Sequence, residues 1–347
     1  MSKLKVWYVQ TEPHTERVFE PEHYQAMLDE FDVTVNTTGR NFTSEEIAAG
    51  IAGYDAIVTG WGAPPLTDAV FENADKLRLV AHSAGSIKAL VSREVIDKYM
   101  IPKGIVLFSA NVAIAYNVAE STVGMLLMTS HRWPDFNAYF KRTGSWKDPS
   151  VRWNARFLKG STVGIVAASK VGREVIKLLS VWPLKMIVHD PFLSDEEAAE
   201  LGVEKVGLNE LFERSDHVTI HLPSIESTNN MIGKEQFDLM KPGATLVNTS
   251  RGSCMDHDAL IEKCKAGLAD PENQGIFVCL DVTTPEPLPK YSEFRLLDNV
   301  YIAPHVSGAG FYGYFKIGEQ TLDALRAFSA GEPVVGAVDY DRYEILA

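Results

Sequence analysis

Short apolar runs rich in Val and Ile alternate with helix-like stretches along most of the chain, and they do so in two blocks. In the first block the predicted strands are 5–10, 32–36, 55–60, 77–81 and 104–109. The stretches between them, at 21–31, 44–51, 67–74 and 92–99, each open with a residue suited to a helix start. Strand–helix alternation at this spacing predicts a parallel sheet covered on both faces.

The second block begins near Ser161. Its predicted strands are 162–167, 185–189, 217–221, 245–248, 277–281 and 300–303, and its helices include 171–179, 194–201, 208–213 and 257–266. A helix-like segment at 117–131 and a polar, aromatic connection at 141–156 separate the blocks, and a last helix at 314–329 precedes a tail expected to return to the first domain. A chain of 347 residues is comfortable for two domains. We therefore predict an α/β fold of two doubly wound parallel-sheet domains.

The composition limits the class of protein. With 46% apolar and 23% charged residues the chain reads as globular, and its net charge of −13 argues against nucleic acid as a partner. No apolar run approaches the roughly 18 residues of a membrane span, and the N-terminal residues lack the apolar core of a signal peptide, so we expect a cytoplasmic protein. Cys254, Cys264 and Cys279 show no paired metal spacing; they are interpreted as reduced structural thiols, and no metal site is predicted.

The segment 162–175 has the order of a dinucleotide-binding turn: a buried strand, small residues and an amphipathic helix. The G-x-G-x-x-G fingerprint is degenerate, since Ala167 and Ser169 stand where the first two glycines are expected and only Gly172 remains. These small replacements hinder the approach of a pyrophosphate modestly, and the helix N-terminus still offers free N–H groups. Alone, the motif is equally compatible with a βα turn that binds nothing.

Asp190 strengthens the dinucleotide hypothesis because it lies 18 residues after Gly172, at the end of the next predicted strand. An acid at this place accepts hydrogen bonds from a ribose diol and repels a 2′-phosphate, so NAD is favoured over NADP. Taken alone, Asp190 would be an ordinary turn residue before Pro191.

Three polar residues follow predicted buried strands in the second block, where open α/β sheets bind their ligands. Arg251 offers a planar fork that matches a carboxylate. His305 can give or take the proton of an alcohol, and Glu286 beside it would favour the protonated ring and fix its orientation. Asp281 would face the nicotinamide end of the cofactor. Each residue alone also fits a structural role, and only the joint placement indicates catalysis.

These residues lie in segments that resemble a known family, the D-isomer-specific 2-hydroxy-acid dehydrogenases, over most of the chain. Segment 239–252 is similar to the family's Arg signature, 280–287 to its Glu signature and 303–308 to its His signature. Segment 118–122 resembles the start of the helix that links its domains, and 221–223 a stretch beside the adenosine. The resemblance implies a Rossmann-type NAD domain at 126–310, a flavodoxin-like substrate domain at 1–125 plus 311–347, a cleft between them, and a homodimer.

The resemblance also implies roles for residues of this chain. Arg251 would bind the carboxylate and keto oxygen of a 2-oxo acid, His305 would donate the proton as hydride arrives, and Glu286 would support His305. Substrate would also contact backbone N–H groups in a small-residue loop, here Ala84, Gly85 and Ser86 after Ser83. Together with the fingerprint, the resemblance gives these expected NAD contacts: Thr122, Ser169, Lys170, Val171, Asp190, His221, Pro223, Thr249, Asp281 and His305.

Two departures from the family pattern stand out. The replaced fingerprint glycines bear on NAD affinity, and an apparent insertion at 268–274 reads as a longer surface loop. Trp61 and the aromatic set Phe311, Tyr312 and Tyr314 are candidates for lining the substrate's side-chain pocket or, equally, for packing.

Alternative functions remain open at this point. An NAD(H)-binding sensor or scaffold on the same fold would explain the altered glycines, but it has no need of an acid–base pair. Formate oxidation would not need the Glu286–His305 pair either, because formate releases no hydroxyl proton. Phosphite oxidation is harder to set aside, since a water must be activated. The sequence leaves open which 2-oxo acid is used and in which direction.

Overall fold

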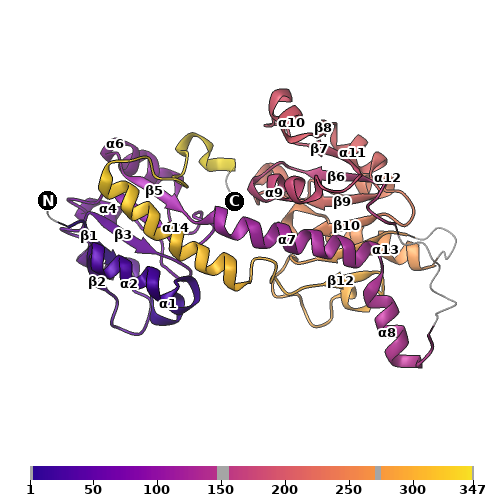
Figure 1. Ribbon diagram of the computed structural model, residues 1–347, viewed down its shortest axis with the longest axis horizontal. Coiled ribbons are helices and arrows are strands. Elements are labelled where there is room, and N and C mark those ends of the chain that lie inside the picture. The colour runs from indigo at the N-terminus through magenta and orange to yellow at the C-terminus, as the bar shows by residue number, and fades with distance from the viewer. Residues whose placement is uncertain (1–2, 147–155, 270–274, 346–347) are drawn as a thin grey trace. The chain divides into compact units, whose positions relative to one another are not determined.

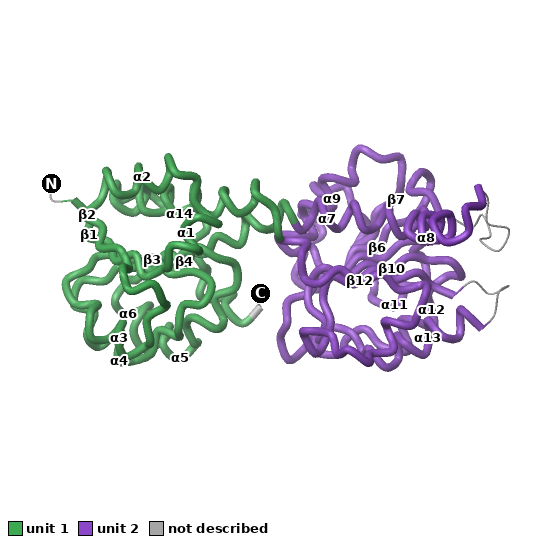
Figure 2. Tube along the Cα trace, turned by 90° about the horizontal axis from the view of Figure 1, so that it is seen from below, with its two compact units in different colours: residues 1–117, 309–347 green, residues 118–308 purple. Residues whose placement is uncertain are grey.

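The computed structural model describes residues 3–146, 156–269 and 275–345. It divides into unit 1, residues 1–117 and 309–347, and unit 2, residues 118–308 (Figures 1 and 2). Much of the predicted connection at 141–156 and of the predicted insertion at 268–274 lies outside the described residues. Each unit contains a parallel sheet of its own.

Unit 1 is built on a five-stranded parallel sheet with the order β2-β1-β3-β4-β5, which is the flavodoxin-like order. The strands are β1 Lys5–Tyr8, β2 Asp32–Val35, β3 Ala56–Thr59, β4 Leu79–His82 and β5 Val106–Ser109. Successive residues of β1 enter opposite cores, Trp7 on one face and Tyr8 on the other. Because both faces are buried, the central strands read as continuous apolar runs.

Helices cover both faces of this sheet. They are α1 Glu12–Val18, α2 Pro21–Glu30, α3 Ser44–Gly50, α4 Asp68–Asn73, α5 Arg93–Val95, the π-helical turn η1 Ile96–Met100, α6 Ile101–Lys103 and α14 Phe311–Ala330. α14 packs against α1 and α2 although it lies far from them in sequence (Figure 1). The tail then pairs Ala337 with Phe108 and ends in η5 Tyr340–Ile345, so the C-terminal segment belongs to the core of unit 1.

Unit 2 contains a seven-stranded parallel sheet with the order β12-β11-β10-β9-β6-β7-β8. The strands are β6 Thr162–Val166, β7 Lys185–His189, β8 Glu204–Lys205, β9 His217–Ile220, β10 Thr245–Asn248, β11 Phe277–Leu280 and β12 Val300–Ile302. Counted from β6, this is the Rossmann order extended by one strand, and the strand order reverses between β6 and β9. Ligands of such sheets bind at the carboxyl ends of the strands beside this reversal.

The helices of unit 2 connect these strands. They are α8 Trp133–Thr143, α9 Lys170–Leu179, α10 Asp195–Leu201, α11 Leu208–Arg214, η2 Glu226–Thr228, α12 Lys234–Leu239, η3 Gly252–Cys254, α13 His257–Ala269 and η4 Glu293–Leu296. Local signals set their starts: Ser194, for example, caps α10 through a reciprocal pair of hydrogen bonds with Glu197.

Helix α7, Asn111–Ser130, runs across the boundary between the units at 117 and 118. By length and hydropathy alone it could cross a membrane, since its mean hydropathy reaches 1.3 over an 18-residue window. Its apolar residues have packing partners in the chain, because Ala113 lies in a core of unit 1, and Ala119 and Leu126 lie in a core of unit 2.

The predicted fold class, two parallel-sheet α/β domains, is confirmed. Strand β8 was not predicted. It is a two-residue edge strand whose residues Glu204 and Lys205 are both exposed, so it carries no apolar pattern.

Candidate active site

The turn after β6 keeps the geometry of a dinucleotide fingerprint although two of its glycines are replaced. Ala167 adopts a left-handed conformation, with φ 74°, at the place of the first glycine. Gly172 packs so closely that a Cβ there would lie 2.2 Å from the Ala167 carbonyl oxygen. Only glycine fits at Gly172, which is the requirement that the third fingerprint glycine meets.

Helix α9 presents unused donors to this turn. Ser169 caps the helix, and its Oγ accepts the N–H of Gly172 at 3.4 Å. Within the described residues no group accepts the backbone N–H of Ser169, Lys170 or Val171. Three adjacent free N–H groups at a helix N-terminus suit a diphosphate, so the turn fits NAD despite its altered sequence.

Asp190 is fixed at the end of β7 by two backbone donors. Its carboxylate accepts the N–H of Ala168 at 2.9 Å and the N–H of Phe192 at 2.8 Å. It therefore joins the fingerprint turn directly, and each oxygen retains a lone pair for a ribose hydroxyl.

His221 and Pro223 follow β9 beside the fingerprint turn. His221 is 3% exposed, and its ring lies 3.6 Å from the place where a Gly172 Cβ would stand. Burial lowers the pKa of His221 to about 3, so the ring is neutral. The Pro223 carbonyl accepts the Thr228 hydroxyl at 2.6 Å.

Arg251 lies in a turn held by the buried side chain of Asn248. The Asn248 Oδ1 accepts the N–H and the hydroxyl of Ser250, at 2.9 and 2.8 Å, and its Nδ2 donates to the Arg251 carbonyl at 3.0 Å. Gly252 presses against the next turn, because a Cβ there would lie 2.2 Å from the carbonyl carbon of Thr283. The turns after β10 and β11 are therefore interlocked.

Glu286 and His305 are brought together by the turns after β11 and β12. The Nδ1 of His305 lies 2.8 Å from Oε2 of Glu286, whose Oε1 accepts the N–H of Thr283 at 2.8 Å. Because Nδ1 is used by Glu286, Nε2 remains free to exchange a proton with a ligand. The His305 side chain is 55% exposed and has access to solvent.

Asp281 holds the backbone around His305. Its carboxylate accepts the N–H groups of Val306 at 2.8 Å and Ser307 at 3.1 Å, and its carbonyl accepts the His305 N–H at 2.8 Å. His305 itself adopts φ 55°, an uncommon conformation for a residue other than glycine. Asp281 is thus a positioning residue for the His305 turn, a role that the sequence did not indicate.

Two further expected residues contact each other. The hydroxyls of Thr122 on α7 and Thr249 after β10 lie 2.7 Å apart, and both residues are buried. This contact ties α7 to the edge of the sheet that carries Arg251.

In unit 1 the loop after β4 contains the buried residues Ala84 and Gly85 and the exposed Ser86. Among the residues that the structure describes, none accepts the N–H of Ala84, Gly85 or Ser86. The Gly85 carbonyl is held by the Ser109 hydroxyl at 2.6 Å. Consecutive free N–H groups form a concavity that suits an anion such as a carboxylate.

The predicted aromatic candidates of unit 1 separate into two groups. Trp61 and Tyr314 lie together, with ring centroids 5.5 Å apart. Phe311 and Tyr312 are 81% and 67% exposed and lie outside this pair. His14, which the sequence analysis missed, joins the pair by an edge contact with Trp61 at 5.7 Å. A lone His between Pro13 and Thr15 gave no pattern that could have indicated it.

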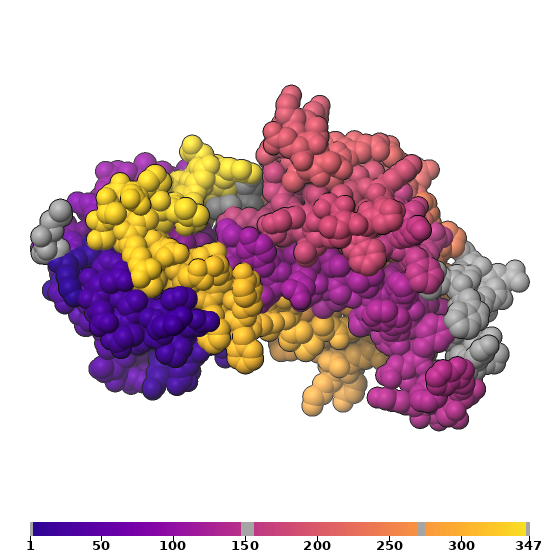
Figure 3. Space-filling model, viewed as in Figure 1, coloured from indigo at the N-terminus to yellow at the C-terminus, as the bar shows by residue number. Residues whose placement is uncertain are grey.

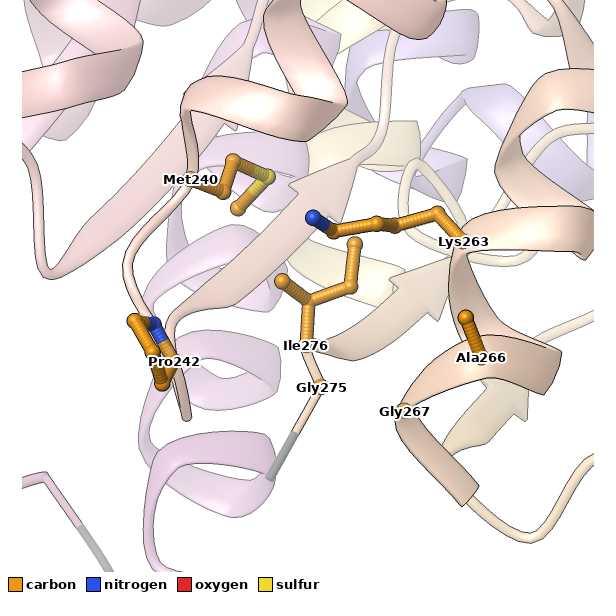
Figure 4. Close-up of a pocket in the computed structure, with 7 residues that line it drawn as sticks. All are labelled: Met240, Pro242, Lys263, Ala266, Gly267, Gly275 and Ile276. Atoms are coloured by element: carbon orange, nitrogen blue, oxygen red, sulfur yellow. The ribbon is translucent and has the colours of Figure 1, made fainter. Parts of the chain in front are cut away.

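A cavity and a possible ligand cluster lie away from these turns. The cavity, about 70 Å³ and lined by Met240, Pro242, Lys263, Ala266, Gly267, Gly275 and Ile276, lies where β10 and β11 begin (Figure 4). It is at the wrong end of the strands for a Rossmann ligand. In the described part of the chain, one group of potential metal ligands gathers, Glu20, Glu22 and His23 at the start of α2.

Comparison with known proteins gives a consistent result. The family model for the NAD binding domain of D-isomer specific 2-hydroxyacid dehydrogenases matches residues 123–307. A D-3-phosphoglycerate dehydrogenase of Methanocaldococcus jannaschii is 33% identical over 291 residues, 83% of this chain and 52% of the relative. A glyoxylate reductase of Korarchaeum cryptofilum is 33% identical over 274 residues, 77% of this chain and 78% of the relative. The chain therefore spans about half the length of the first relative and most of the second.

The fold is shared with solved structures. A phosphoglycerate oxidoreductase from Rhizobium etli superposes with a TM-score of 0.81 at 23% identity, over 98% of this chain and 99% of that one. At this identity the likeness establishes the fold and leaves the substrate open.

Proposed function

Because the chain belongs to the D-isomer-specific 2-hydroxyacid dehydrogenases, we propose that it interconverts a small 2-oxo acid and the D-2-hydroxy acid, with NAD as cofactor. In this proposal unit 2 binds the dinucleotide and unit 1 binds the substrate. The observation that carries it is the 2.8 Å contact between His305 and Glu286, because a binding protein has no need of a poised acid–base pair.

NAD, when bound, supplies or accepts the hydride. The free N–H groups of Ser169, Lys170 and Val171 would bind its diphosphate, and Asp190 its ribose hydroxyls. We assign Thr122, His221, Pro223, Thr249 and Asp281 to the surroundings of the cofactor.

Each unit contains groups that we assign to the substrate's polar groups. In unit 1 the N–H groups of Ala84, Gly85 and Ser86 would bind the carboxylate. In unit 2 the guanidinium of Arg251 would bind the carboxylate and polarise the keto oxygen. The Nε2 of His305 would give the keto oxygen its proton during reduction and take it back during oxidation, while Glu286 stabilises the charged ring.

The test is a spectrophotometric assay of NADH oxidation with a panel of 2-oxo acids. Turnover in the wild type, and loss of turnover in Arg251→Ala and His305→Ala with NADH binding retained, would support the proposal. Tight NADH binding without turnover of any 2-oxo acid would instead favour a sensor or scaffold protein. Full activity in either variant would refute the assigned roles.

A homodimer is part of the proposal, and helix α8 offers a surface for it. None of its residues is buried, and it projects from the rest of unit 2 (Figures 1 and 3). Trp133 and Phe140 are about half exposed, and Phe140 contacts the more exposed Trp146. Exposed aromatic side chains in one patch are typical of an interface. Trp133→Glu with Phe140→Glu should convert a dimer to a monomer in light scattering; an unchanged mass would place the interface elsewhere.

The cellular setting is also proposed. The three cysteines are free and buried, as expected for a reducing cytoplasm, and the charge of −13 disfavours nucleic acid as a partner. Fractionation of cells that express the chain would test the location, and recovery with membranes would contradict it.

A further inference from the structure

Three aromatic rings from distant segments meet at the carboxyl edge of the unit 1 sheet. His14 comes from α1, Trp61 from the turn after β3 and Tyr314 from α14. The ring centroids lie 5.7 Å apart for His14 and Trp61, and 5.5 Å apart for Trp61 and Tyr314. The His14 Nε2 reaches the Ser83 Oγ at 3.1 Å, so this aromatic cluster adjoins the loop whose free N–H groups follow Ser83.

A chain of hydrogen bonds defines the state of His14. The Ser83 hydroxyl donates to the Thr59 carbonyl at 2.7 Å, so its only proton is used. Nε2 of His14 must therefore carry a hydrogen and donate to Ser83, which leaves Nδ1 without one. Burial, reinforced by the charge of Arg17, lowers the pKa of His14 to about 4. The cluster therefore contributes no positive charge at neutral pH.

The cluster is built rigidly. A Cβ on Gly60 would lie 2.4 Å from the His14 ring, so only glycine permits the ring to sit there. The buried Gln10 amide accepts the Gly60 N–H at 2.7 Å and donates to the Trp61 carbonyl at 3.2 Å. Trp61 is nevertheless 36% exposed, so the backbone is fixed while one part of the indole remains open to a ligand.

The chemistry of this surface selects among 2-oxo acids. An exposed indole and a half-buried phenol beside a neutral imidazole favour apolar or aromatic groups, and none of the three rings compensates a phosphate or a second carboxylate. Arg17 lies one turn further along α1 and acts on His14 through its charge, but its side chain is exposed to solvent. The contact between His14 and Ser83 brings this cluster next to the Ala84–Ser86 loop, where we assign the substrate's carboxylate.

We propose that Trp61, His14 and Tyr314 form the subsite for an uncharged, bulky side chain, so that the preferred substrate is an aromatic or branched-chain 2-oxo acid. This inference rests on the proposed dehydrogenase function. It differs from what the names of the compared relatives suggest, because glyoxylate has no side chain and 3-phosphoglycerate carries a phosphate.

The experiment compares kcat/KM for phenylpyruvate, 4-methyl-2-oxopentanoate, glyoxylate and 3-phosphohydroxypyruvate. The wild type should favour one of the first two by at least about tenfold, the factor given by about 1.4 kcal/mol of binding free energy. Trp61→Ala should remove most of that preference, leave glyoxylate nearly unchanged, and be partly rescued in Trp61→Phe. The matched control is Trp182→Ala, at a tryptophan of unit 2 with similar exposure. This variant should change neither the substrate preference nor the activity with glyoxylate.

The outcomes distinguish a failure of the proposed subsite from a failure of the proposed dehydrogenase function. Turnover with glyoxylate or 3-phosphohydroxypyruvate preferred would overturn the inference and keep the dehydrogenase. An equal loss for all four substrates in Trp61→Ala, with NADH binding and melting temperature unchanged, would also overturn it, because specificity would then not depend on the indole. If 3-phosphohydroxypyruvate is preferred and Arg17→Ala removes the preference, Arg17 is the determinant instead. Turnover of another 2-oxo acid but of none of these four would also overturn the inference, and no turnover of any 2-oxo acid would refute the proposed function as well.

Discussion

The His305 Nδ1 lies 2.8 Å from Oε2 of Glu286, and the other oxygen of that carboxylate accepts the Thr283 N–H. Glu286 is thus anchored at one oxygen and engages the imidazole with the other. This leaves Nε2 as the ring nitrogen for proton transfer and makes its orientation depend on the turn after β11. The relationship supports a division of roles in which one residue transfers the proton and the other stabilises the charged ring.

Replacing Glu286 by Gln should lower kcat strongly without loss of NADH binding. The amide keeps the size of the side chain but removes the charge that favours the imidazolium, so kcat should fall by about 10²-fold or more. Steady-state kinetics would measure kcat, and titration with NADH would measure cofactor binding. Glu293→Gln, at an exposed carboxylate in the same unit, serves as the control. A kcat near the wild-type value in Glu286→Gln would show that the pair is structural.

Asn248 should act on the substrate through Arg251. Asn248→Ala removes the hydrogen bonds that shape the Ser250–Arg251 turn, so the guanidinium loses its fixed position and KM should rise about tenfold, as for a binding loss near 1.4 kcal/mol. Asn248→Asp keeps the acceptor for Ser250 and loses the donation to Arg251, so an intermediate KM is expected. If Asn248→Ala lowers only the melting temperature while KM of the folded enzyme stays unchanged, the role of Asn248 is purely structural.

The sequence predicted the fold well because its signals are local and repeated. The alternation of apolar strands and helices was enough to place both sheets, and the dinucleotide turn was found through Gly172 and Asp190 although two glycines were missing. The edge strand β8 escaped because an exposed strand of two polar residues has no pattern to detect.

The candidate site was predicted where a role follows from chemistry and missed where it follows from packing. Glu286 and His305 could be paired because a carboxylate and an imidazole have an obvious joint use. His14 could not be linked to Ser83, which is 69 positions away, and Asn248 and Asp281 act through backbone N–H and carbonyl groups whose positions only the folded turns define. Which aromatic residues cluster also required the structure, since Tyr314 and Tyr312 differ by only two positions on α14.

Ala167 should be replaceable by glycine with a gain in stability. The left-handed conformation at φ 74° costs an alanine roughly 1–2 kcal/mol, and glycine avoids this cost. Glycine loses more backbone entropy on folding, which offsets part of the gain, so we expect Ala167→Gly to raise the unfolding free energy by about 0.5–1 kcal/mol. Ala168→Gly is the matched control, because the neighbouring residue does not have a positive φ and should lose stability. Urea unfolding of both variants measures whether each substitution raises or lowers the unfolding free energy. A loss of stability in Ala167→Gly equal to that in Ala168→Gly would show that Ala167 is not strained.

The buried His221 should make the stability of the protein fall as the solution becomes acidic. Burial lowers its pKa to about 3, whereas a histidine in the unfolded chain titrates near about 6.5. Below about pH 6.5 the unfolded chain therefore takes up a proton that the folded ring refuses until about pH 3, and the free energy of the unfolded state falls relative to that of the native state. At pH 5 this one residue accounts for a loss of about 2 kcal/mol relative to pH 7.5.

His221→Phe removes this titration and keeps a planar ring against Gly172. The quantity to measure is the change in unfolding free energy between pH 7.5 and pH 5, so a lower baseline stability of the variant cancels. The wild type should lose about 2 kcal/mol more than the variant over this interval, since every other titrating group, His14 included, is common to both. Equal losses in the two proteins would mean that His221 finds a partner for its charged form in the folded state, and the neutral ring assigned to the cofactor site would then be wrong.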